Sequence, residues 1–315
     1  MDGCLSMSSA AEPRTAPLGL LFALVAVGPL LAQQPELAPP GPAILIVADM
    51  EGVTGVVTSE QLGPTGFEYQ RFREFMTDEV LAAMEGARAA GAGRILVADS
   101  HGNGQNLLIE RFPEDVRVIR SWPRTLGMVE GVDQDVDGVL FVGFHAGTSN
   151  PDGVRAHTMS SANLTGLVLN GEPASEALWG AAIAGHFGVP VLMLSGDDAI
   201  AESARRFLPS LEVAVVKRAL SFHAADTLTP AAGRELIRTT AERAVRRIGS
   251  VRPFRVDTPV EVTVRFKHYQ PSQLLALLPI FERPDAHSVS FRAQDMVEAS
   301  RILEFLGDYR IDLEP

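Results

Sequence analysis

Metal-binding side chains follow three apolar runs of this sequence, at the point where each run ends. Asp49 and Glu51 come after the first run. Asp99 and His101 follow the second, and His145 follows the third. Carboxylates and imidazoles without a cysteine favour a hard or borderline cation such as Zn²⁺ or Mn²⁺. Carboxylate-rich sets of this kind often hold two ions, with one carboxylate bridging them. The pattern therefore predicts a metal centre, although acidic residues at a strand end are also typical of ordinary turns.

The spacing of Asp49 and Glu51 fits this hypothesis. Side chains on an extended strand alternate between its two faces, so these two carboxylates share one side if the strand geometry continues through Met50. Met50 then points back toward the core, and Gly52 allows the chain to bend away.

The three runs belong to a longer alternation of predicted elements. Apolar runs predict strands at 43–48, 94–102, 137–147, 189–198 and 211–217. Apolar residues and alanine-rich segments between them predict helices at 69–90, 174–188 and 199–209. This alternation indicates an α/β fold, with a mostly parallel central sheet covered by helices on both faces. The carboxyl ends of such strands converge on one crevice, so the three sets of polar residues should meet.

The C-terminal part has a different pattern. Residues 229–249 predict a long amphipathic helix, and 259–268 alternate apolar and polar residues as in a half-exposed strand. Residues 288–308 predict a strand that leads into a last helix. We therefore expect an α/β metal-binding core at 42–217 and a smaller α+β portion at 218–315 packed on it.

The first 32 residues are typical of a signal peptide. An apolar run at 16–32 follows the single basic residue Arg14, and Pro29 interrupts it, which favours a cleaved signal over a membrane span. A Pro/Gln-rich linker follows at 33–41. We expect export to the periplasm or secretion, with an uncleaved membrane anchor as the alternative. Cys4 is the single cysteine, so cleavage would leave a chain without a thiol nucleophile or a disulfide.

Composition excludes some partners. The formal net charge is −12, which argues against nucleic acid or an anionic membrane as a partner, because either would select a basic surface. If the signal is cleaved, we expect no stable membrane partner. A hydrophobic content of 46% is ample for a packed core.

Two further residues have an ordinary explanation and a functional one. His157 follows a turn-rich loop and could be an exposed loop histidine. Glu176 lies in the first turn of a predicted helix, where the helix dipole alone favours an acidic residue.

The ordered motifs resemble those of the M55 family of zinc-dependent D-aminopeptidases. They are VADMEGVTG at 47–55, VADSHG at 97–102, GVLFVGFHA at 138–146, NGEPASE at 170–176 and FRAQDMVEA at 291–299. A single Asp-x-Glu-Gly would be a weak signal, but the set in this order is specific and extends over the chain after residue 42. At the position of the serine that begins the family signature, this chain has Val47. This departure bears on the hydrogen bonds around the metal ligands more than on metal binding itself.

The resemblance implies the roles of the site residues. Two Zn²⁺ ions would be held by family-matched ligands, with Asp49 as the bridge, and His157 would be the catalytic histidine, a proton shuttle or an oxyanion stabiliser. Asp99 is expected to orient a ligand imidazole. The implied metal ligands are Asp49, Glu51, His101, His145 and Glu176.

The resemblance also implies an activity: hydrolysis of the N-terminal bond of short peptides, with D-alanine the most obvious first residue. A homo-oligomer, a decamer by resemblance, is expected. A related amidase acting on cell-wall fragments would use the same ligands, and a binding protein that lost the chemistry is a third reading. The choice between D- and L-residues, and between zinc and manganese, stays open.

Overall fold

The computed structural model describes residues 41–309. The predicted signal peptide, all of the linker except its last residue and the last six residues of the chain lie outside the described residues. Within 41–309, none of the helices combines the length and the apolar character that a membrane crossing requires.

A large sheet of seven strands lies at the centre of the described part, in the order β3-β2-β1-β4-β7-β8-β9. Neighbouring strands run parallel except β9, which pairs antiparallel with β8. The bounds are β1 Ala43–Ala48, β2 Arg94–Asp99, β3 Arg117–Ile119, β4 Gly138–Phe144, β7 Val191–Asp197, β8 Glu212–Ser221 and β9 Ala224–Thr227. Every residue of β1 and of β4 is buried, as expected for central strands covered on both faces.

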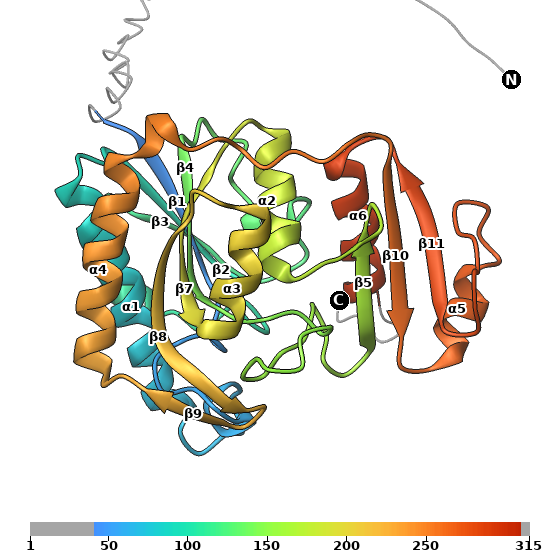
Figure 1. Ribbon diagram of the computed structural model, residues 1–315, viewed down its shortest axis with the longest axis horizontal. Coiled ribbons are helices and arrows are strands. Elements are labelled where there is room, and N and C mark those ends of the chain that lie inside the picture. The colour runs from blue at the N-terminus through green and yellow to red at the C-terminus, as the bar shows by residue number, and fades with distance from the viewer. Residues whose placement is uncertain (1–40, 310–315) are drawn as a thin grey trace, which may run out of the picture. The chain divides into compact units, whose positions relative to one another are not determined.

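Helices cover both faces of this sheet (Figure 1). One apolar core lies under α1, Tyr69–Ala89, and α4, Pro230–Arg246, which pack against each other. The other core lies under α2, Glu176–His186, and α3, Asp198–Phe207. The short 3-10 helices are η1 Ser59–Gln61, η2 Ile109–Arg111, η3 Gly127–Val129 and η4 Ile248–Ser250.

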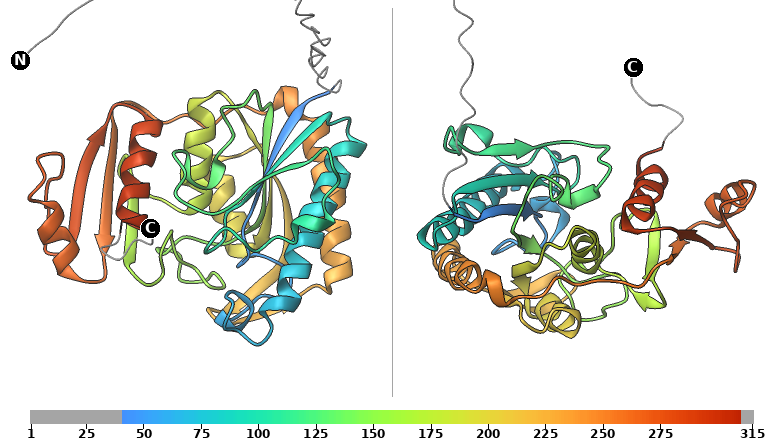
Figure 2. Two further views of the ribbon diagram at one scale, coloured as in Figure 1. Left: turned by 180° about the vertical axis from the view of Figure 1, so that it is seen from behind. Right: turned by 90° about the horizontal axis from the view of Figure 1, so that it is seen from above.

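A second, smaller sheet is antiparallel, in the order β11-β10-β5-β6 (Figure 2). Helices α5 and α6 both contact β10 and β11, and α6 also contacts α2. The bounds are β5 Leu164–Leu169, β6 Glu172–Pro173, β10 Val260–Phe266, β11 Ser288–Ala293, α5 Tyr269–Leu275 and α6 Met296–Asp308.

The predicted fold class is confirmed, but the border between the two sheets does not coincide with the predicted boundary at residue 217. Strands β5 and β6 precede residue 217 and yet belong to the small sheet, because β5 pairs with β10. Strand β9 and helix α4 follow residue 217 and yet extend or cover the large sheet. Long-range pairing decides this division, and no local pattern in the sequence shows it.

Candidate metal centre

The register of the large sheet brings the three sets of polar residues together. Ala48 at the end of β1 pairs with Asp99 on one side and with Val142 on the other. The chain therefore leaves β1, β2 and β4 at neighbouring points of one sheet edge, as the sequence predicted.

Close backbone packing shapes the turn after β1. Gly52 donates its N–H to the carbonyl oxygen of Gly143 at 2.7 Å. A β-carbon on Gly52 would overlap the carbonyl oxygen of Phe144, so only glycine fits here. Met50 is fully buried in the core under α1, as predicted, and the carboxylates on either side of it face the opposite way.

The first group of candidate ligands consists of Asp49, Glu51 and His101. The Nδ1 atom of His101 lies 3.2 Å from Asp49 Oδ1 and 2.8 Å from Glu51 Oε2. All three side chains are buried.

The second group consists of His145, His157 and Glu176. The Nε2 atom of His145 lies 3.5 Å from Glu176 Oε1, and that of His157 lies 3.8 Å from the same oxygen. Glu176 enters from the first turn of α2, where the side chain of Ser175 caps the helix. The N–H of Met159 donates to Glu176 Oε1 at 2.7 Å and fixes that carboxylate.

Asp49 connects the two groups. Its Oδ1 faces His101, and its Oδ2 lies 3.3 Å from His145 Nε2. His157 Nε2 also lies 3.9 Å from Glu51 Oε1, which gives a second link. All six residues named from the sequence thus form a single cluster.

Backbone carbonyls orient the three imidazoles. His101 Nε2 lies 2.7 Å from the carbonyl oxygen of Leu62, and the Nδ1 atoms of His145 and His157 each lie 2.9 Å from a carbonyl oxygen. A carbonyl oxygen only accepts, so the nitrogen facing it carries the proton. When the ring is neutral, its other nitrogen directs a lone pair at the carboxylates, as a metal ligand requires.

The donor atoms fit metal ions better than they fit one another. Asp49 Oδ2 and His145 Nε2 are buried without a hydrogen-bond partner. Buried polar atoms are normally paired, and an unpaired one costs about 1–3 kcal/mol. Three carboxylates and three imidazoles without cysteine are also the donor set that Zn²⁺ accepts.

The electrostatics of the cluster favour positive charge at its centre. Burial and the neighbouring Glu51 carboxylate raise the pKa of Asp49 to about 7. Burial alone would lower the pKa of His145, but the carboxylates of Glu176 and Asp49 outweigh it and raise that pKa to about 10. The carboxylates thus stabilise a cation beside them, which a metal ion supplies.

Asp99 does not orient a ligand imidazole, contrary to the prediction. Its Oδ2 accepts from the N–H groups of Asn106 and Leu107, and its Oδ1 accepts from Asn106 Nδ2 at 2.8 Å. Asn106 Nδ2 also donates to the carbonyl oxygen of His101 at 2.6 Å. Asp99 therefore shapes the loop that carries His101, while a carbonyl orients the ring itself.

Sequence reasoning assigned no role at the site to two charged residues that are buried in the structure, Lys217 and Asp197. Lys217, in the middle of β8, donates to carbonyl oxygens of the turn after β1. Asp197 at the end of β7 accepts from Val154 N–H at 2.8 Å and caps α3. Their only sequence signal was a charged residue ending an apolar run, which equally fits a solvent-exposed strand end.

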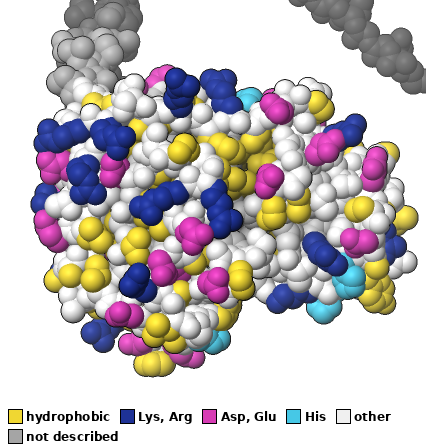
Figure 3. Space-filling model, viewed as in Figure 1, with side chains coloured by type: hydrophobic (Ala, Val, Ile, Leu, Met, Phe, Trp, Pro, Cys, Tyr) yellow, Lys and Arg dark blue, Asp and Glu magenta, His cyan; other side chains and the backbone are white. Residues whose placement is uncertain are grey.

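A cavity lies beside the segments that carry His145 and Glu176, but none of the six cluster residues lines it. It has a volume of 770 Å³, and its wall includes Ser175, which precedes Glu176, and Gly147, two residues after His145. Figure 3 shows apolar side chains in the hollow between the parts built on the two sheets. Phe207 and Phe254 are among the residues that line the 770 Å³ cavity.

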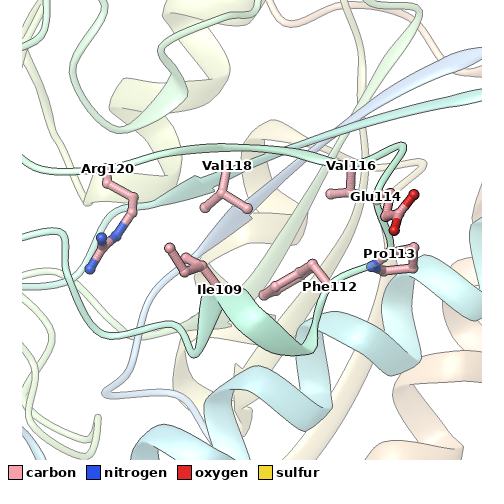
Figure 4. Close-up of a pocket in the computed structure, with 7 residues that line it drawn as sticks. All are labelled: Ile109, Phe112, Pro113, Glu114, Val116, Val118 and Arg120. Carbon is pink, nitrogen blue, oxygen red and sulfur yellow. The ribbon is translucent and has the colours of Figure 1, made fainter.

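A smaller pocket of 340 Å³ lies beside β3 and η2 (Figure 4). It contains none of the cluster residues. Its lining includes Ile109, Phe112, Val116 and Val118, with the charged residues Glu114 and Arg120.

A mostly parallel sheet that carries a buried carboxylate–imidazole cluster at its strand ends defines an α/β metalloenzyme. Residues 43–305 match the peptidase family M55, described as D-aminopeptidase, and the chain belongs to this family. The resemblance seen in the sequence is thus confirmed.

Two comparisons support this assignment. The chain is 35% identical over 254 residues to the D-aminopeptidase of Bacillus subtilis (strain 168). The alignment covers 80% of this chain and 91% of that protein. Its fold is similar to the Zn-dependent D-aminopeptidase DppA from Bacillus subtilis, a self-compartmentalizing protease, with a TM-score of 0.80 and 30% identity. That match covers 84% of this chain and 96% of the other.

Proposed function

We propose that this protein is a zinc-dependent aminopeptidase that removes the N-terminal D-residue, D-alanine foremost, from short peptides. Family membership and the two comparisons with Bacillus subtilis D-aminopeptidase support the reaction class. The single observation that carries the proposal is the position of Asp49, with one carboxylate oxygen toward His101 and the other toward His145. In this position Asp49 would be shared by two metal positions.

The other ligands divide between these two positions. Glu51 and His101 would join Asp49 in holding the first ion, and His145 and Glu176 would join it in holding the second. When bound, the zinc ions supply Lewis-acid activation of water and of the peptide carbonyl. The chain's own residues would hold the ions in a buried site, and backbone groups orient His101, His145 and Glu176.

His157 is the proton carrier in this proposal. Its Nε2 lies between Glu51 and Glu176, 3.9 and 3.8 Å from their oxygens, so it faces both metal positions. The carbonyl oxygen of Arg155 holds the proton on Nδ1, which leaves Nε2 able to accept one. From there it delivers the proton to the leaving amine.

A dipeptide panel tests the activity. Metal-stripped protein is reloaded with Zn²⁺ or Mn²⁺ and assayed on matched D-Ala and L-Ala dipeptides, with free or acetylated N-termini. We expect release of D-alanine only from free D-dipeptides with zinc. Turnover of L-peptides alone contradicts the stereochemistry, and cleavage of the acetylated peptides identifies an amidase instead.

We also propose that the protein assembles into a homo-oligomer, a decamer by family resemblance. The support is that the similar Bacillus subtilis structure is of a self-compartmentalizing protease. Light scattering after size-exclusion chromatography should give ten times the mass of the mature chain. A monomer in that measurement overturns the proposal.

Export is the last part of the proposal and rests on residues 1–32. An N-terminal sequence that begins after Ala32, from protein recovered outside the cytoplasm, would support it. Recovery of the intact N-terminus with the membrane fraction indicates the uncleaved anchor.

A further inference from the structure

Lysine is rare in this chain, and one of its lysines is buried beside the metal centre. The sequence has 27 lysines and arginines, of which only Lys217 and Lys267 are lysine. Lys267 is exposed, whereas Lys217 is 1% exposed. A chain that uses arginine for nearly every cation, and yet buries a lysine, needs something there that arginine does not provide.

The ammonium group of Lys217 meets three backbone carbonyls of a single turn. Its Nζ donates to the carbonyl oxygens of Glu51, Val53 and Val56, the last two at 3.1 and 2.7 Å. An ammonium has three N–H donors, so all of them are used. Lys217 therefore closes the turn that begins at the ligand Glu51.

The geometry explains why the residue is lysine. An ammonium is compact and directs its three donors tetrahedrally, whereas a guanidinium is a larger planar fork with five donors. Three carbonyl oxygens that converge on one point match the three donors of an ammonium group. Arginine in this buried space would have unpaired donors and excess volume.

Other buried groups complete the support of the turn. Glu79 on α1 accepts from the N–H of Thr54 at 2.9 Å. The carbonyl oxygens of the turn accept from Lys217, and the N–H of Thr54 donates to Glu79. Both partners hold the turn from its core side, away from the Glu51 carboxylate.

The second metal position has separate supports. Ala146 orients His145, and Met159 together with the helix cap at Ser175 positions Glu176. Lys217 makes no hydrogen bond with these residues in the part of the chain that the structure describes.

We propose that Lys217 is a positioning residue for zinc. It holds the backbone of Glu51 and thereby sets the zinc affinity of the Asp49–Glu51–His101 position, but not that of the position formed by Asp49, His145 and Glu176. This inference rests on the proposed two-zinc site.

The test separates the two positions with ligand variants. His145→Ala leaves only the first position intact, and His101→Ala leaves only the second. Lys217→Met is added to each, and zinc affinity is measured by competition with a chromogenic chelator. In the His145→Ala background we expect a loss of about 10- to 100-fold, the usual effect of removing a residue that supports a ligand. In the His101→Ala background we expect no change.

Two single variants serve as controls in the otherwise wild-type chain. Lys267→Met removes the exposed lysine and should leave both zinc affinities unchanged. Lys217→Arg keeps the charge but not the geometry, and it should not restore the affinity that Lys217→Met loses. An equal effect of Lys217→Met in both backgrounds, or none in either, overturns the inference.

A measurement on the wild-type protein avoids variants that fail to fold. Labelling lysine with ¹⁵N at Nζ gives signals from the two lysine side chains only. We expect the Lys217 signal to be protected from solvent exchange and to shift when zinc is added, while the Lys267 signal stays in place. A Lys217 signal that exchanges freely or ignores zinc overturns the inference. Wild-type protein that binds no zinc overturns the proposed function itself.

Discussion

The imidazole rings of His145 and His157 lie parallel, with their centroids 4.2 Å apart and their planes at 4°. Both rings have Nδ1 against a backbone carbonyl, so both present Nε2 to the same oxygen of Glu176. Burial and the neighbouring His145 hold the pKa of His157 below its usual range. A neutral His157 can accept a proton near neutral pH, which suits the proton carrier proposed above.

The first prediction separates catalysis from metal binding at His157. His157→Gln should lower kcat about 10²- to 10⁴-fold, the usual contribution of a general acid–base group. Zinc content, measured by atomic absorption, should stay at two ions per chain. A drop to one ion per chain would show instead that His157 is a ligand of the second position.

The second prediction concerns the second position directly. His145→Ala should abolish peptidase activity and zinc uptake at that position, because it removes a buried ligand facing Asp49 and Glu176. His268→Ala is the matched control, since His268 is exposed at the end of the small sheet. Full metal content and rate in the His145 variant would refute the ligand assignment.

The third prediction is that zinc stabilises the fold. Ligands that meet only in the folded chain bind metal only there, so zinc at about 100 times its Kd should add about 2.7 kcal/mol per site to the free energy of unfolding. Thermal unfolding with and without a chelator checks this. An unchanged Tm after chelation would argue against the site.

The fourth prediction concerns the turn after β1. Gly52→Ala should destabilise the protein strongly and reduce zinc binding, because its β-carbon would overlap the carbonyl oxygen of Phe144. Gly63→Ala is the control, since a β-carbon there meets open space and φ is not positive. Denaturant unfolding compares the two variants. Equal stabilities would mean that the close approach does not restrict residue 52.

The fifth prediction is a pH dependence from Glu79, which is 1% exposed. Burial raises its pKa from an ordinary 4.5 to about 7, so the folded chain holds this proton more tightly than the unfolded one. Its contribution to stability is therefore complete below about pH 4.5 and is lost as the pH rises to about 7, a loss of about 3 kcal/mol.

Glu79→Gln should remove this dependence. Urea unfolding of both proteins in the presence of a chelator, at about pH 5 and about pH 8, measures the difference between them at each pH. As the pH rises from about 5 to about 8, we expect the free energy of unfolding of the wild type to fall relative to that of Glu79→Gln. A constant difference would mean that Glu79 keeps an ordinary pKa.

The sequence by itself determined the fold class and the composition of the cluster. Apolar runs and helical periodicity are local, and they placed β1, β2, β4, β7 and β8 within a few residues. Parallel sheets converge at their strand ends, so the residues after three of those strands were expected to meet, and Asp49, His101 and His145 do.

Only the tertiary structure decided which residues support that cluster. Asp99, Asp197 and Lys217 each end an apolar run, and the sequence does not distinguish among them. Strand pairing and the depth of burial direct Asp99 to the loop of Asn106, Asp197 to Val154, and Lys217 to the turn after Glu51. The same long-range pairing moved β5 into the small sheet. A buried polar group is specified by the partner that satisfies it, and that partner lies far away in the chain.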